Sequence, residues 1–154
     1  ASPTQSGDWH QWGGPHRNGQ ISGATTWPTS LDADRLKKEW RIPLGSSYSG
    51  PSVVGSRVFG TETQNRSHEV VRALDRTSGK ELWQVKWKGA LKVPFFARAN
   101  GSWIRSTPAS DGKRLFVAGI RDVLVCLDVT SGKQLWTVDF AKKYRSPLPG
   151  FGTV

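Results

Sequence analysis

The chain contains 154 residues, 36% of them hydrophobic, and its 22 Lys and Arg against 12 Asp and Glu give a net charge of +10. This hydrophobic content excludes a disordered chain, and the single cysteine, Cys126, excludes an internal disulfide and a thiolate zinc cluster. No apolar run approaches the roughly 18 to 20 residues that a membrane-spanning helix needs, and eight tryptophans with 17 glycines and nine prolines indicate a turn-rich all-β chain.

Residues 1–35 are predicted to form an N-terminal extension or loop. The chain has no methionine and starts on the small, polar run Ala1–Gly7, which favours a processed, exported protein of which a part lies elsewhere. His10 and His16 lie in a glycine-rich segment without a third ligand nearby, so no metal site is predicted.

Residues 36–45 are predicted to form an outer strand. Trp40 takes the same place in this segment as Trp83 and Trp136 take in two later strands, but no first three strands precede it. In a ring of blades that is closed by overlapping termini, such a strand completes the last blade. We therefore expect residues 36–45 to be the outer closing strand of a blade whose other strands lie outside this chain.

Two copies of one repeat follow. Aligned without gaps, residues 70–87 and 123–140 are identical at ten of eighteen positions, and their offset of 53 is close to the roughly 40 to 50 residues of a propeller blade. Each copy is predicted to form four short antiparallel strands. The first blade, residues 46–88, is expected to hold strands at 50–55, 57–63, 69–75 and 81–87, and the second, residues 104–141, at 104–110, 114–120, 122–128 and 134–140.

The two copies share a turn that begins with Asp, ends with Gly-Lys and precedes a Trp at a fixed spacing. The Asp side chain caps backbone N–H groups, and the Gly takes a left-handed φ. The Trp is expected to pack between blades, because its large ring fills the wedge while its one N–H finds an acceptor. A structural role is therefore predicted for Trp40, Asp75, Gly79, Trp83, Asp128, Gly132 and Trp136.

The segment Ala73–Trp83, ALDRTSGKELW, resembles the tryptophan-containing repeat of PQQ-like, or quinoprotein alcohol dehydrogenase-like, β-propellers. The segment Trp9–Gly19 resembles the opening of exported bacterial members of this family. The likeness covers most of the chain. It implies an all-β fold: a β-propeller of four-stranded antiparallel blades, of which this chain holds two blades plus an outer closing strand, an incomplete ring.

One face of the predicted propeller carries the candidate functional loops. Because successive strands are antiparallel, the loops before each first strand share a face with the loops between second and third strands. The long inter-blade loop at 89–103 and the linker at 142–154, which leads into a third blade, belong to the same face. Basic residues alternate there with aromatic ones, which suits a protein or glycan partner; solvated cations beside aromatics packed on the blades are the alternative. The candidate partner face comprises Tyr48, Ser49, Arg66, His68, Lys92, Arg98, Trp103, Arg105, Ser106, Lys142, Lys143 and Arg145.

Two functions stay open at this point. The first is a non-catalytic exported scaffold, in the periplasm, at the cell surface or outside the cell, that binds an envelope protein or an anionic glycan. The second is a fragment of a PQQ-dependent oxidoreductase acting on alcohols or sugars. In those enzymes, the resemblance implies, the ring mouth holds the quinone with Glu, Asn and Asp around a calcium ion and a vicinal disulfide. This chain shows no such set and no catalytic residues, so no cofactor is evident in it, although the complete propeller could hold PQQ and calcium. The remainder of the propeller is a further expected partner, and nucleic acid is not expected.

Overall fold

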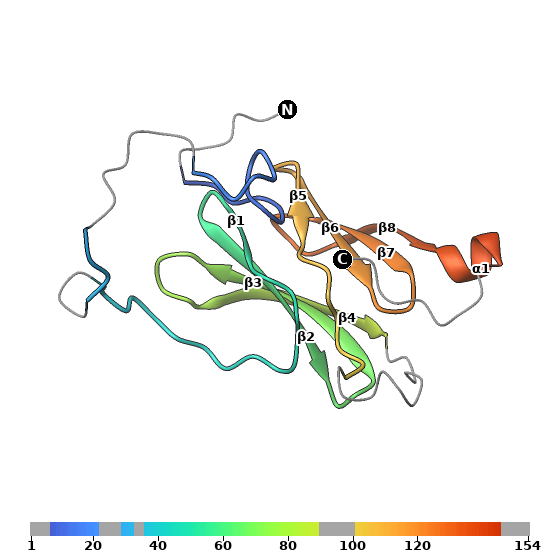
Figure 1. Ribbon diagram of the computed structural model, residues 1–154. Coiled ribbons are helices and arrows are strands. Elements are labelled where there is room, and N and C mark those ends of the chain that lie inside the picture. Colours follow the sequence, from blue (N-terminus) through green and yellow to red (C-terminus); the bar gives the residue numbers. More distant parts are fainter. Residues whose placement is uncertain (1–6, 22–28, 33–35, 90–100, 146–154) are drawn as a thin grey trace.

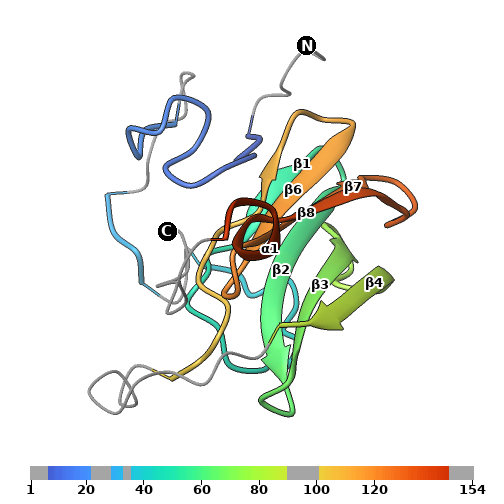
Figure 2. The same cartoon turned by 90° about the vertical axis from the view of Figure 1, so that its right-hand side faces the viewer.

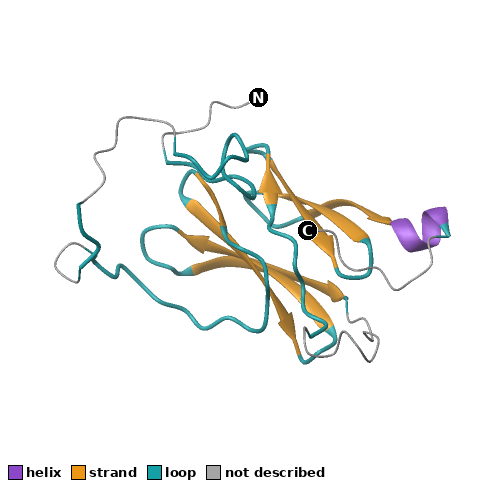
Figure 3. Cartoon of the chain, in the orientation of Figure 1, coloured by secondary structure: helices purple, strands orange, loops and turns teal. Residues whose placement is uncertain are grey.

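The computed structural model describes residues 7–21, 29–32, 36–89 and 101–145. Within these residues the regular elements are eight strands and one short helix, α1, Phe140–Tyr144 (Figure 3). The strands form two separate four-stranded antiparallel sheets, each with its strands in sequence order, and the sheets do not close into a ring. The prediction of two propeller blades in an incomplete ring is confirmed.

The first blade contains β1 (Ser52–Val54), β2 (Arg57–Gln64), β3 (His68–Asp75) and β4 (Glu81–Lys88). Seen from the side, β2, β3 and β4 follow one another outward across the blade (Figure 2). A tight turn joins β2 to β3, with Asn65 and Arg66 both in the left-handed region at φ 51° and 52°. Three residues, 65–67, connect the strands, and the two successive left-handed residues match the twist of antiparallel strands.

The second blade contains β5 (Ala109–Ser110), β6 (Arg114–Gly119), β7 (Val123–Asp128) and β8 (Gln134–Asp139). Its pairing repeats that of the first blade. Ala73 lies opposite Trp83 in the first, Cys126 lies opposite Trp136 in the second, and in both blades the register shifts at the next pair. The shared irregularity shows that the two repeats are equivalent in structure as well as in sequence.

The inner strands are shorter than predicted. The expected strand at 104–110 is reduced to β5, Ala109–Ser110, and that at 50–55 to β1, Ser52–Val54. Pro108 and Pro51 carry no amide N–H for a ladder. Ile104 instead bonds across to the first blade: its N–H donates to the Thr63 hydroxyl at 3.0 Å, and its carbonyl accepts from the Tyr48 N–H at 3.0 Å.

The turn between the third and fourth strands of each blade is held as the sequence predicts. Oδ1 of Asp75 accepts from the N–H groups of Thr77 and Ser78 at 3.1 and 2.7 Å, and Gly79 has φ 70°. The second turn repeats these bonds, with Asp128 as the acceptor and Gly132 at φ 71°. Both aspartates are therefore engaged as turn caps.

The hydrophobic core lies between the two blades. Side chains from β2 and β3 of the first blade pack against β6 and β7 of the second, and their fully buried members include Phe59, Val71, Leu115, Val117 and Leu127. Each large aliphatic side chain buried in this way stabilises the fold by about 1.5 to 3 kcal/mol relative to exposure. The shared core joins the blades into one unit.

Trp83 contacts the second blade. Its Nε1–H donates to the carbonyl of Val129 at 3.1 Å, and its ring covers Gly132, where a Cβ atom would lie only 2.7 Å from the indole. Trp40 occupies the equivalent site on the first blade: its Nε1–H donates to the Arg76 carbonyl at 2.8 Å, and its ring covers Gly79. Each of these two sites needs a glycine, because a side chain at that position would displace the indole.

Residues 36–45 form no strand, which differs from the prediction of an outer strand. A strand requires a paired neighbour, and no described residue offers one to this segment's outer edge. Instead the segment is fastened to the first blade through Trp40 and through the Pro43 carbonyl, which accepts from Nη1 of Arg72 at 3.1 Å. The Trp40 indole thus lies where the repeat predicts it, although residues 36–45 do not pair as a strand.

The N-terminal segment bridges the inner edges of both blades (Figure 1). Trp9 exchanges two backbone hydrogen bonds with Val53 of β1, at 2.9 and 2.8 Å. The carbonyl of the next residue, His10, accepts from the N–H of Ser110 in β5 at 2.8 Å. One short stretch therefore ties the inner strands together.

Candidate functional site

The β2–β3 turn, the β6–β7 turn and α1 lie on one side of the blades, at the lower right of Figure 1, whereas the β1–β2, β3–β4 and β5–β6 turns lie at the upper left. Residues 46–49 and 101–106 join the first side, since Ser46 pairs with Thr63 near the end of β2 and Ile104 bonds to the same residue. We call this side the loop face. The sequence predicts the partner residues on this face.

Three of those residues come together in one cluster on the loop face. The rings of Tyr48 and Trp103 are 5.4 Å apart between centroids and inclined by 38°, and the guanidinium carbon of Arg105 lies 5.1 Å from the Tyr48 ring centroid. Nη2 of Arg105 also donates to the Gly101 carbonyl at 3.2 Å. We call Tyr48, Trp103 and Arg105 the mouth cluster, because they precede the inner strands of the two blades.

A layer of hydroxyl groups supports this cluster. The Ser47 hydroxyl bonds to that of Ser49 at 3.0 Å, and Ser49 bonds in turn to Thr61 of β2. Ser106, a predicted partner residue, is buried and its hydroxyl donates to the Ala118 carbonyl. Ser49 and Ser106 therefore hold the backbone of the mouth in place and do not project toward a partner.

The other predicted residues lie around the cluster. Arg66 is exposed in the β2–β3 turn, and His68 at the start of β3 is half-buried with Nδ1 bonded to the Ser67 hydroxyl at 2.8 Å. Lys92 and Arg98 lie outside the described residues, so their placement stays a prediction.

Lys142, Lys143 and Arg145 belong to α1 and its C-terminal cap, not to an extended linker. The predicted fourth strand at 134–140 ends at Asp139, whose carboxylate accepts from the Lys142 N–H at 2.8 Å and starts the helix. Arg145 ends it in the left-handed conformation at φ 52°. The three cations are exposed on the loop face beside the β6–β7 turn, where the Phe140 N–H bonds to the Asp122 carbonyl at 2.9 Å.

Glu69 is the residue that sequence reasoning missed. This side chain of β3 is 1% exposed and lies at the junction of the blades on the loop-face side. One carboxylate oxygen accepts from Nε1 of Trp87 at 2.7 Å and the other from the N–H of Ile120 in the second blade at 2.6 Å. Burial raises its pKa, while these two hydrogen bonds and the charge of Arg121 act in the opposite direction. The one signal in the sequence is an acidic residue directly before the apolar pair Val70 and Val71.

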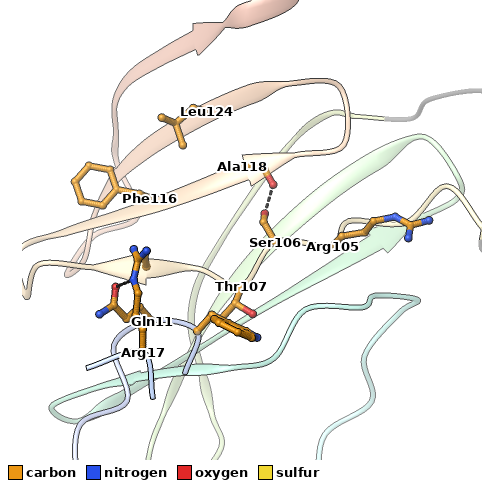
Figure 4. A pocket seen from close by; sticks show the side chains of 10 residues that line it. Gln11, Arg17, Arg105, Ser106, Thr107, Phe116, Ala118 and Leu124 are labelled. Carbon is orange, nitrogen blue, oxygen red and sulfur yellow. Dashed lines mark hydrogen bonds between the residues drawn. The ribbon is translucent and has the colours of Figure 1, made fainter. Parts of the chain in front are cut away.

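A cleft of about 320 Å³ lies between the N-terminal segment and the outward face of the second blade. Figure 4 shows Arg17 held against Gln11 on one wall, Phe116 and Leu124 on the other, and the guanidinium of Arg105 directed away. In the second blade Phe116 lies opposite Cys126 on the neighbouring strand, as Phe59 lies opposite Ala73 in the first blade. Phe59 is fully covered by the second blade. By this equivalence the cleft wall corresponds to the face of the first blade that the second blade covers, and we do not interpret it as a ligand site.

Trp136 lies on the same uncovered face. It is 39% exposed and, among the described residues, has no contact site like those of Trp40 and Trp83.

The described residues bring no three His, Cys, Asp or Glu side chains together in a geometry that could hold a metal ion. The hydroxyls of the mouth are already bonded to one another or to backbone groups, and Asp75 and Asp128 cap turns. These residues by themselves do not provide the oxygen ligands of a calcium ion. No helix in the described ranges is long and apolar enough to cross a membrane.

Two curated proteins resemble this chain. It is 28% identical over 130 residues to polyvinylalcohol dehydrogenase of Sphingopyxis sp. (strain 113P3), a match that covers 83% of this chain and 18% of that protein. It is 29% identical over 119 residues to the outer membrane protein assembly factor BamB of Moranella endobia (strain PCIT), with 72% of this chain and 29% of that protein covered. The chain therefore spans less than a third of the length of either relative.

A solved structure of a europium-containing methanol dehydrogenase superposes with a TM-score of 0.62 at 20% identity, covering 88% of this chain and 23% of that one. This likeness supports the PQQ-type propeller fold. A family model described as outer membrane protein assembly factor BamB matches residues 67–152, more than half of the chain. The repeat, the blade geometry and this match agree, and the chain belongs to the family of the outer membrane protein assembly factor BamB.

Proposed function

We propose that this chain is part of an exported, non-catalytic β-propeller that binds a protein or glycan partner through its loop face. The observation that carries the proposal is the mouth cluster, in which Tyr48 from the first blade meets Trp103 and Arg105 from the segment before the second. Trp, Tyr and Arg are the residues that most often dominate binding energy at protein interfaces. The relative named as an assembly factor supports a scaffold role.

The cluster is also preorganised. The Tyr48 N–H is held by the Ile104 carbonyl, and Arg105 by the Gly101 carbonyl and the Tyr48 ring. A partner therefore does not have to order these side chains on binding, which is one of the main costs of association.

A photo-crosslinking side chain placed in the full-length protein tests the proposal. With the crosslinker in place of Arg66, exposed in the β2–β3 turn on the loop face, we expect an adduct with an envelope component, whereas the same group in place of Lys113, exposed in the β5–β6 turn on the opposite side, forms none. An adduct at position 113 alone would contradict the proposed use of the loop face.

A PQQ-dependent oxidoreductase is the second candidate, favoured by the similarity to a protein named polyvinylalcohol dehydrogenase. In that case the remainder of the propeller would supply the quinone and calcium ligands that the described residues lack. Thermal melting of the full-length protein with and without PQQ and calcium separates the two functions, because a ligand that binds only the folded state raises the melting temperature. No shift is expected for the scaffold, and a rise of several degrees with quinone absorbance would favour the enzyme.

A further inference from the structure

The loop face carries exposed positive charge. Exposed cations surround the mouth on the loop face: Arg66, Lys88, Lys142, Lys143 and Arg145. Of the carboxylates on this face in the described residues, Glu62 and Glu69 are buried and accept hydrogen bonds, and Asp139 caps α1. Asp122, half-buried in the β6–β7 turn, remains beside Arg121. The loop face therefore carries an excess of exposed positive charge.

On the opposite face each of the cationic turns between β3 and β4, β5 and β6, and β7 and β8 also holds a carboxylate. Asp75 and Asp128 lie there in the β3–β4 and β7–β8 turns, next to cations of the same turns. Asp111 in the β5–β6 turn pairs with Nη2 of Arg114 at 2.7 Å. The exposed cations of the loop face favour an anionic partner there.

The geometry of the mouth cluster distinguishes between anionic partners. A sugar ring stacks on a free, flat aromatic face. Here the Tyr48 and Trp103 rings are inclined by 38°, and Arg105 lies over the Tyr48 ring. Tyr48 is nevertheless 53% exposed. Two inclined rings with a guanidinium at their side suit an apolar side chain followed by a carboxylate, as on a protein segment.

Resting on the proposed function and specifying its partner, we propose that the loop face binds an acidic protein segment. An aromatic or aliphatic side chain of that segment packs against Tyr48 and Trp103, and its carboxylates face Arg105 and the cations of the β2–β3 turn and α1. Such a complex combines a desolvated aromatic anchor with charges at its rim, which steer association and weaken with salt.

Fluorescein-labelled random copolymer of glutamate and tyrosine is the probe, and polyglutamate and polygalacturonate of similar charge are the comparison polymers. With the full-length protein we expect the copolymer to bind at least tenfold more tightly than either comparison polymer. Tyr48→Ala, a change at an exposed position, should remove most of this preference. Lys142→Glu should weaken binding of all three polymers, and Lys113→Glu on the opposite face should weaken none.

Several outcomes would overturn the inference. Equal or tighter binding of polygalacturonate would identify a glycan as the partner. Loss of binding in Lys142→Glu together with an unchanged Tyr48→Ala would show attraction by charge alone. If the crosslinker at position 66 captures an envelope component that the copolymer does not displace, the proposed function stands and the acidic segment is wrong. If no adduct forms at position 66, the proposed function itself fails.

Discussion

Gly119, the last residue of β6, occupies the tightest point of the junction between the blades. Its φ is not in the left-handed region, so the backbone would accept alanine. The place of an alanine Cβ is, however, taken by the Glu69 carboxylate, and Nε1 of Trp87 lies 3.1 Å from it. Gly89 closes the other side of the same carboxylate. The Glu69 side chain therefore has no free direction in which to move.

Gly119→Ala should force the carboxylate away from at least one of its two donors, Nε1 of Trp87 and the N–H of Ile120. A buried donor left without a partner costs about 1 to 3 kcal/mol, and overpacking of a filled interior costs about as much again. We expect the free energy of unfolding to fall by about 2 to 5 kcal/mol. The Ile120 amide should also exchange its hydrogen faster.

Urea unfolding of the full-length protein and amide exchange measure these effects. Gly50→Ala is the matched control, because its Cβ would meet only the Thr107 hydroxyl at 3.7 Å and its φ is not left-handed. In a Glu69→Ala background the cost of Gly119→Ala should largely disappear, which a double-mutant cycle detects. A change of less than about 0.5 kcal/mol in Gly119→Ala alone would refute the reasoning, since that is the usual effect of a neutral surface substitution.

Carboxyl NMR titration should show Glu69 releasing its proton above the ordinary pH range of a glutamate, because burial raises its pKa. Glu69→Gln should remove a contribution to the free energy of unfolding that declines as pH rises through the folded pKa. Asp75 and Asp128 should titrate below their ordinary range, because hydrogen bonds from Ser78 and Ser131 lower their pKa; their contribution is present above the ordinary value and is lost as pH falls through the folded pKa. Reversed directions in the titration would contradict the hydrogen bonding described here. Trp83→Phe should lower the free energy of unfolding by about 1 kcal/mol through loss of the bond to Val129, while Trp12→Phe, at a 67% exposed position, should leave it unchanged in the same urea assay. Equal effects of the two substitutions would argue against a specific contact site for Trp83 on the second blade.

The repeat and its turns could be predicted because they are local. The Asp and Gly of each third-to-fourth-strand turn fix the hairpin through bonds within six residues, so Asp75 and Asp128 have the same role in both blades. The place of Trp83 could be predicted for a related reason: its position after the hairpin is set by the turn, and its ring needs both apolar contact and an acceptor.

The start of α1 and the length of the inner strands could not be predicted in this way. Val138–Phe140 continues the alternating pattern of a strand, and the change to a helix at Phe140 depends on the Asp139 cap and on the contact with the Asp122 carbonyl. The inner strand at 104–110 lost most of its pairing because Ile104 bonds to residues of the other blade. Both outcomes depend on partners far away in the chain.

The arrangement of the candidate site could likewise be predicted only in part from the sequence. The sequence alone determined that Tyr48, Trp103 and Arg105 precede inner strands and therefore belong to one face. Only the tertiary structure decided that they touch, because the bond between the Tyr48 N–H and the Ile104 carbonyl joins two segments 56 positions apart. It also decided that Ser49 and Ser106 face inward and that Glu69 links the blades. A repeat pattern specifies each blade, whereas contacts between blades depend on packing that no single repeat contains.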